Sequence, residues 1–185
     1  MKRRIKMDEN SANDLQLGEL IPHSFDYNLS LEELDKWLTE QYEQLSQKKI
    51  PSLAGDCAML GAALDLIDFA KNNLDISLDF SEKSLDGLRI IISMMRESYV
   101  EEKPSDEIFA TWVNMTSGLF GCIIIKNLGG NWVESNAGMS VVVNGTAAFI
   151  TNQVLGLISG ENNNENAVIE IYDYLKKQSG NADAE

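Results

Sequence analysis

The sequence predicts an α+β fold, with about five or six helices packed around a small antiparallel three-stranded β-meander at residues 131–150. Three observations carry this prediction. Several segments repeat apolar residues at helical spacing, and a run of 18 uncharged residues, 108–125, indicates a central buried helix at about 106–128. The Asn144-Gly145 pair, between two β-prone segments, is a strong hairpin signal because both turn positions need positive φ.

The chain is expected to form one domain, at about residues 29–178. Residues 1–28 are polar and read as an N-terminal arm that is flexible or loosely docked, and residues 179–185 as a frayed tail. Ser30 and Glu33 have the spacing of a capping box, which predicts a helix over about 31–48. A second helix is expected at about 55–72.

The next segment, 76–80, alternates apolar and polar residues, and it fits either a short strand or an extended link. Ser81 or Ser84 is expected to cap a third helix. Trp112 lies inside the uncharged run and is expected in the core. Gly129 and Gly130 are expected to end the central helix.

The hairpin register is expected to place Val143 opposite Thr146 and Met139 opposite Ile150. Both faces of this sheet carry apolar residues, so helices should cover one face and at least part of the other. Short helices are expected at 151–158 and 167–177. An exposed edge of the meander is a site where the chain could associate with a second copy.

The uncharged run also has the length of a membrane span. We expect burial in the core, because polar residues interrupt the run and no second span accompanies it. Asp8 and Glu9 follow the basic start of the chain where a signal peptide would be apolar. Cys57 and Cys122 both lie in apolar stretches and are read as reduced core residues, so a cytoplasmic protein is expected.

The net charge and the absence of known catalytic motifs limit the classes of function that we expect. With 29 acidic and 15 basic residues, the chain carries a formal charge of −14, which disfavours nucleic-acid binding. His23 is its single histidine and lies in the predicted arm, so a Ser-His-Asp or Cys-His centre is not expected. The sequence contains no phosphate-binding loop and no Cys-x-x-Cys pair. We therefore expect no cofactor, no metal and no catalytic residue.

Two small groups of residues are candidates for function. Asp65 and Asp68 are three residues apart and so share a helical face, as a carboxylate pair in an enzyme or metal site would. Asn131, Trp132 and Glu134 open the meander and form a candidate interaction surface, although for Trp132 itself the core is the favoured position. Acids at helix ends and on outer faces are more often simply solvated.

From Leu78 onward the chain resembles a family of small bacterial proteins known only as a domain of unknown function. The resemblance rests on Leu78–Leu85 as the entry to a helix, on Ser117–Cys122 as a helix centre, and on Gly129-Gly-Asn-Trp132 before a short meander. It implies the fold but no activity. The chain departs from the family pattern at Ser117, where Gly is favoured, and at Cys122, where Glu is favoured.

The resulting expectation is a non-catalytic binding or accessory protein, of the kind that neutralises a toxin, whose acidic surface meets a basic protein partner. Two alternatives stay open from the sequence. One is an enzyme or metal-binding protein that uses paired carboxylates, and the other is a protein that binds a small molecule in an apolar pocket beneath the meander.

Overall fold

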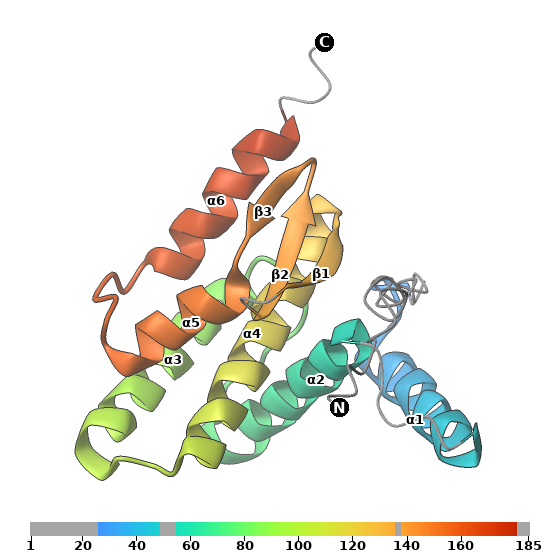
Figure 1. Ribbon diagram of the computed structural model, residues 1–185, viewed down its shortest axis with the longest axis horizontal. Helices are drawn as coiled ribbons and strands as arrows, with labels where there is room; N and C mark the ends of the chain where they lie inside the picture. The colour runs from blue at the N-terminus through green and yellow to red at the C-terminus, as the bar shows by residue number, and fades with distance from the viewer. Residues whose placement is uncertain (1–25, 49–54, 136–137, 181–185) are drawn as a thin grey trace, which may run out of the picture.

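The α+β prediction is confirmed by a computed structural model, which describes residues 26–48, 55–135 and 138–180. These residues form six helices and one antiparallel sheet with strand order β1-β2-β3 (Figure 1). His23, most of the predicted arm and residues 181–185 lie outside the described residues. The elements are α1 (Leu31–Lys48), α2 (Gly55–Leu74), α3 (Ser84–Glu102), α4 (Asp106–Leu128), β1 (Asn131–Ser135), β2 (Gly138–Val143), β3 (Thr146–Ala148), α5 (Ile150–Ser159) and α6 (Ala167–Gly180).

Two helices begin as the sequence predicts. At α1 the backbone N–H of Ser30 donates to Glu33 Oε2 at 2.8 Å, and the Glu33 N–H donates to Ser30 Oγ at 3.3 Å, which completes the capping box. At α4 the hydroxyl of Ser105 accepts from the Ile108 N–H at 3.4 Å. The helix that follows has the predicted bounds, Asp106–Leu128. Local hydrogen bonds therefore fix where α1 and α4 begin.

The start of α3 differs from the prediction that Ser81 or Ser84 caps it. The helix begins at Ser84, with Lys83 as the preceding residue. Both serine hydroxyls instead donate to Asp79 Oδ1, at 2.5 and 2.8 Å, and no side chain caps the helix at Lys83. Residues 76–79 form an extended link rather than a strand, and Leu78 and Phe80 are buried in the core.

The meander has the predicted turn but a shorter last strand. Val143 pairs with Thr146, and Asn144 and Gly145 both have positive φ, at 45° and 77°. The predicted pairing of Met139 with Ile150 is wrong, because β3 ends at Ala148 and Ile150 begins α5. As the first residue of that helix, Ile150 is fully buried. A short apolar run by itself does not distinguish a strand from a buried helix start.

Helix α4 lies at the centre of the fold. Helices α2, α3, α5 and α6 pack around it, and the sheet covers its C-terminal half (Figure 1). Helices α2 and α4 lie very close together at Gly118, where a Cβ would lie only 2.4 Å from the backbone oxygen of Met59. Glycine at this position allows two helix backbones to approach each other. The core therefore depends on a residue without a side chain as well as on large apolar residues.

Among the described helices, α4 alone has both the length and the apolar composition of a membrane span. Most of its apolar stretch, 61% of the residues, is buried inside the fold, as in the core helix of a soluble protein. Residues from Thr116 to Ile124 are buried almost completely, including the polar Thr116 and Ser117. The expectation of a core helix agrees with this arrangement, which is compatible with a soluble protein.

Candidate functional site

The structure separates the three candidate residues at the start of the meander. Trp132 is only 6% exposed and lies over Gly121, where a Cβ would come within 1.9 Å of the indole ring. Its side chain thus belongs to the core, one of the two alternatives for this residue. Asn131 and Glu134 are exposed. The glutamate lies near the start of α2, 3.7 Å from where a Cβ of Gly55 would be. The three side chains do not form one exposed surface.

Both cysteines are free thiols buried in the core. Burial, with a smaller contribution from Asp56, raises the pKa of Cys57 to about 12. Burial also raises the pKa of Cys122 well above its ordinary value. Because the thiolate is the reactive form, neither group is suited to act as a nucleophile near neutral pH.

We expect both thiols to resist alkylation by iodoacetamide at pH 8 in the folded protein. In denaturant both should react at the rate of an ordinary cysteine, which serves as the control. The measurement is mass-spectrometric counting of alkylated cysteines against time. Rapid modification of either residue under native conditions would contradict its burial.

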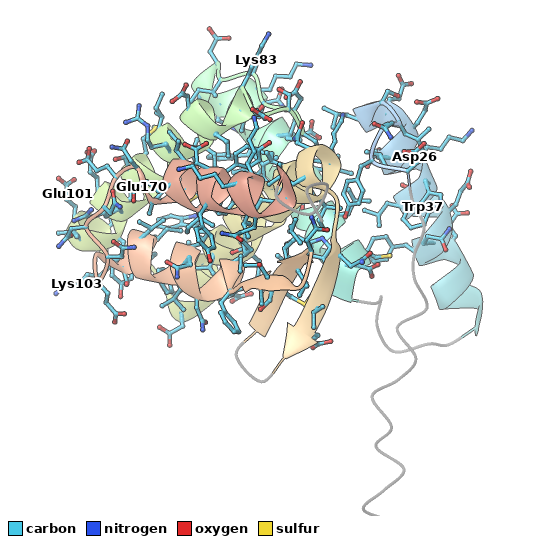
Figure 2. The ribbon with its side chains drawn as sticks, turned by 90° about the horizontal axis from the view of Figure 1, so that it is seen from above. Asp26, Trp37, Lys83, Glu101, Lys103 and Glu170 are labelled. Atoms are coloured by element: carbon cyan, nitrogen blue, oxygen red, sulfur yellow. The ribbon has the colours of Figure 1, made fainter. Side chains whose placement is uncertain are left out.

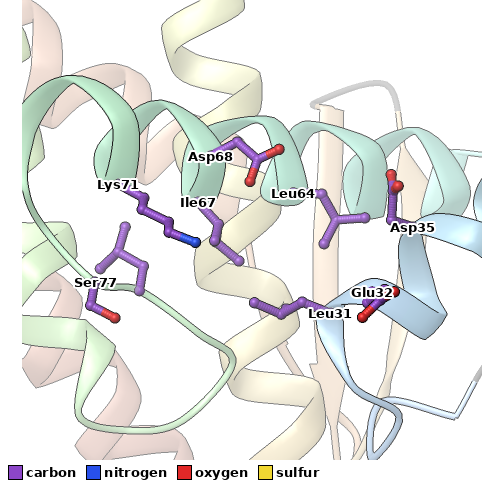
Figure 3. Close-up of a pocket in the computed structure, with 9 residues that line it drawn as sticks. Leu31, Glu32, Asp35, Leu64, Ile67, Asp68, Lys71 and Ser77 are labelled. Carbon is purple, nitrogen blue, oxygen red and sulfur yellow. The ribbon is translucent and has the colours of Figure 1, made fainter.

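Asp68 lines an acidic cleft that the fold forms between α1 and α2. The cleft has a volume of about 400 Å³ and combines an apolar floor with a polar rim. Figure 3 shows Leu64 and Ile67 pointing from α2 towards Leu31 of α1. The remaining lining residues are Glu32 and Asp35 from α1, Asp68 and Lys71 from α2, and Ser77 and Leu78 from the extended link.

Asp65 lies beside this cleft, and the negative charges of the cleft affect the pKa of its carboxyl group. Partial burial raises the pKa of Asp65 above its usual range, and the negative charges of Asp68 and Asp35 raise it further. These carboxylates therefore repel one another across the α1–α2 boundary. The predicted pair on one helical face is present, and α1 adds a third acid that the pairing did not anticipate.

The raised pKa of Asp65 predicts how stability depends on pH. The folded protein holds this proton at a pH where the unfolded chain, with a pKa of about 3.9, has lost it. The free energy of unfolding therefore falls as the pH rises through the folded pKa, and ionised Asp65 destabilises the fold at pH 7. We expect Asp65→Asn to raise the melting temperature at pH 7 and to leave it unchanged near pH 3.

Calorimetry on both proteins across this pH range tests the expectation. Glu161→Asn is the matched control, because it removes one exposed carboxylate from the loop before α6. A stabilisation by Asp65→Asn that is equal at pH 7 and pH 3 would show that the fold does not disfavour the charged form of Asp65.

The cleft has little of what catalysis by carboxylates requires. The described part of the chain contains no group of three or more His, Cys, Asp or Glu residues placed to hold one metal ion. Asp65 is not among the residues that line the cleft. The cleft offers an apolar floor beside three carboxylates and one cation, Lys71, so acids outnumber basic groups at its rim. A Lys or Arg side chain fits such a site, because its stem can contact the leucines while its cation meets the acids.

A second hollow, of about 360 Å³, lies beside the third strand of the meander, where the sequence left open a pocket for a small molecule. Residues of β3, α5, α6 and the intervening loop line it, including the half-exposed Phe149 and Tyr174. It lies at an edge of the sheet. β1 and β3 are both edge strands, and self-association through either edge stays a prediction.

Comparison of the chain with protein-family models, with curated proteins and with solved structures found no match. The resemblance of residues 78–175 to a family with a Gly-Gly-x-Trp motif stays a prediction. The contribution of α1 to the cleft was missed from sequence, although Glu32 and Asp35 have the same three-residue spacing as Asp65 and Asp68. That spacing is the signal that could have identified it.

Proposed function

We propose that this protein is a non-catalytic, cytoplasmic binding protein whose acidic surface binds a basic protein partner. The observation that carries the proposal is the group of carboxylates at the α1–α2 boundary, where the charges of Asp68 and Asp35 add to partial burial in raising the pKa of Asp65. Two ion pairs occur within the described residues, Arg89–Asp86 at 3.9 Å and Lys176–Glu82 at 2.9 Å, and both lie on other elements. The acids that line the cleft, Glu32, Asp35 and Asp68, form no ion pair within the described residues, so their charge is available for a partner.

The chemistry of the cleft favours a protein with exposed Lys or Arg residues. The net charge of −14 repels nucleic acids and other polyanions, and it accelerates the approach of a basic surface. The apolar floor beneath the acids accommodates the aliphatic part of a basic side chain. Blocking the basic surface of a toxin, as an immunity protein does, is one use of such a site.

Replacing the cleft acids tests the proposal directly. We expect the triple variant Glu32→Gln, Asp35→Asn, Asp68→Asn to bind a 20-residue oligolysine about tenfold more weakly than the wild type. Exposed charge pairs contribute about 0.2–1 kcal/mol each, and about 1.4 kcal/mol corresponds to a tenfold change in affinity. Isothermal titration calorimetry at low salt measures the difference.

The control variant removes the same charge elsewhere, through Glu161→Gln, Glu165→Gln and Asp173→Asn, which are all exposed residues of the α5–α6 region. It should bind oligolysine within about twofold to threefold of the wild type. Equal loss in the two variants would mean that overall charge, rather than the cleft, governs binding. An absence of oligolysine binding to the wild type would overturn the proposed function.

A further inference from the structure

A third hollow, of about 320 Å³, lies where α2 meets α3 and α4. We define the groove by its lining residues, seven of which are apolar and include three methionines. The lining residues are Phe69 and Leu74 of α2, Ile91, Met94, Met95 and Ser98 of α3, and Thr111, Trp112 and Met115 of α4.

The apolar side chains of the groove are partly open to solvent. Phe69 is 42% exposed and Met94 is 41% exposed, and the nearby Ile90 and Ile108 are exposed to a similar degree. Trp112 is half-buried at the wall of the groove, whereas the sequence placed it in the core. Neighbouring exposed apolar side chains are typical of interaction sites, and methionine side chains adapt readily to a partner.

The walls of the groove determine the conformation that an occupant must have. All three walls are helices, whose backbone N–H and C=O groups are already hydrogen-bonded within each helix. A partner strand would find no edge here with which to pair. An amphipathic helix satisfies its own backbone and can place one apolar stripe in the groove. Ile91 to Ser98 spans about 10 Å of α3, so the stripe needs about two helical turns.

The rim of the groove determines the charge of the occupant. Asp65 lies one turn before Phe69 on α2, Glu101 and Glu102 lie one turn after Ser98 on α3, and Glu107 lies one turn before Thr111 on α4. All four acids are exposed, and Lys103 is the one cation beside them in the described α3–α4 connection. Figure 2 shows Glu101 and Lys103 at the same end of the molecule. A second copy of this chain would bring acid against acid.

We propose that the groove between α2, α3 and α4 binds a basic, amphipathic helix of a partner protein. The helix places apolar residues at positions i, i+3 or i+4, and i+7 against Phe69, Met94 and Met115, and its Lys or Arg residues face the acidic rim. This deepens the proposed function and rests on it, because it names the kind of basic segment that the protein recognises. The groove and the α1–α2 cleft share no lining residue.

The test uses the full-length chain and an 18-residue peptide that is helical, with leucines on one face and lysines elsewhere. A peptide of the same composition in scrambled order and the 20-residue oligolysine are the comparison probes. We expect the amphipathic peptide to bind at least tenfold more tightly than either. In spectra of ¹³C-methyl methionine, the signals of Met94, Met95 and Met115 should shift, and that of Met139 on the sheet should stay in place.

Two pairs of variants locate the contact. Met94→Gln with Phe69→Ser should weaken binding of the peptide at least tenfold, while Tyr174→Ser with Phe149→Ser should change it less than twofold. Those four residues are all more than 40% exposed, so each variant is expected to fold. Glu101→Gln with Glu107→Gln should weaken peptide binding about fivefold, and Asp35→Asn with Asp68→Asn should leave it within twofold.

Three outcomes would overturn the inference. Equal affinity for the amphipathic and scrambled peptides would show that binding depends on charge alone and not on an apolar helical face. The proposed function would still hold if oligolysine binds. Loss of peptide binding in the cleft variant but not in the groove variant would place the site at α1–α2. Tighter peptide binding after replacing Lys2, Arg3, Arg4 and Lys6 by Gln would show that this chain's own N-terminal segment occupies the groove. Failure of oligolysine binding tests the proposed function separately.

Discussion

Gly118→Ala is expected to destabilise the protein by about 3 kcal/mol, the upper part of the range for overpacked cores. A Cβ at this position would lie 2.4 Å from the backbone oxygen of Met59 and 3.0 Å from the backbone nitrogen of Ala63. Both atoms belong to the backbone of α2, so relief requires the two helices to move apart. The intrinsic preference of a helix for Ala over Gly, about 1 kcal/mol, opposes the loss but is smaller.

Thermal unfolding followed by circular dichroism measures this effect, with an expected fall in melting temperature of about 6–12 °C for a chain of this size. Gly156→Ala is the matched control, because this helical glycine of α5 has its nearest neighbour, Cβ of Asn162, at 3.7 Å. That substitution should be neutral or stabilising by up to about 1 kcal/mol. Equal effects of the two substitutions would contradict the close contact between α2 and α4.

Trp132→Ala is expected to cost about 3–5 kcal/mol, the usual range for removing a large buried aromatic residue. The indole is 6% exposed and lies against α4 at Gly121, so its removal leaves a cavity between the sheet and the central helix. Denaturant titration gives the free energy of unfolding. Tyr174→Ala, at a residue that is 55% exposed, is the control and should cost less than about 0.5 kcal/mol.

The coupling between Trp132 and Gly121 gives a further check of the same contact. Gly121→Ala alone should be strongly destabilising, because its Cβ would lie 1.9 Å from the indole ring. In a Trp132→Ala background the same change should cost little, because the ring that it clashes with is gone. Additive effects of the two substitutions on the free energy of unfolding would contradict this packing. A small loss of stability in the single variant Trp132→Ala would place the indole at the surface.

The helices could be predicted from sequence where local chemistry marks their ends. Ser30 with Glu33 marks the start of α1, and Ser105 before two acids marks the start of α4. Ile150 shows where this approach fails, because an apolar residue after a β-prone segment suits both a strand and a buried helix start. The fold around it decides the outcome, since α5 packs on both α3 and α4.

Of the acids at the candidate cleft, those of α2 could be predicted from sequence, and those of α1 could not. The three-residue spacing of Asp65 and Asp68 places them on one face of α2. Which element lies against that face is a matter of tertiary packing, and it is α1 that contributes Glu32 and Asp35. Trp112 illustrates the same limit, because the absence of charge suggested burial on all sides of α4, whereas the first turns of that helix border an open groove.

The α1–α2 cleft and the groove between α2, α3 and α4 are proposed to bind the same kind of basic partner. The cleft offers carboxylates over an apolar floor for single basic side chains, and the groove offers a longer apolar surface with acids around it. A partner with a basic surface and an amphipathic helix can use both. Asp65 lies one turn from Phe69 and three residues from Asp68, so a charge change there should affect both surfaces.

A pull-down from the lysate of the native host, at low and at high salt, tests most directly whether a basic protein binds this acidic surface. Mass spectrometry identifies the proteins retained by the wild type and by the Glu32→Gln, Asp35→Asn, Asp68→Asn variant. We expect a basic protein that the wild type retains at low salt and loses at high salt, and that the variant retains weakly. Retention of partners that is insensitive to both salt and the variant would contradict it.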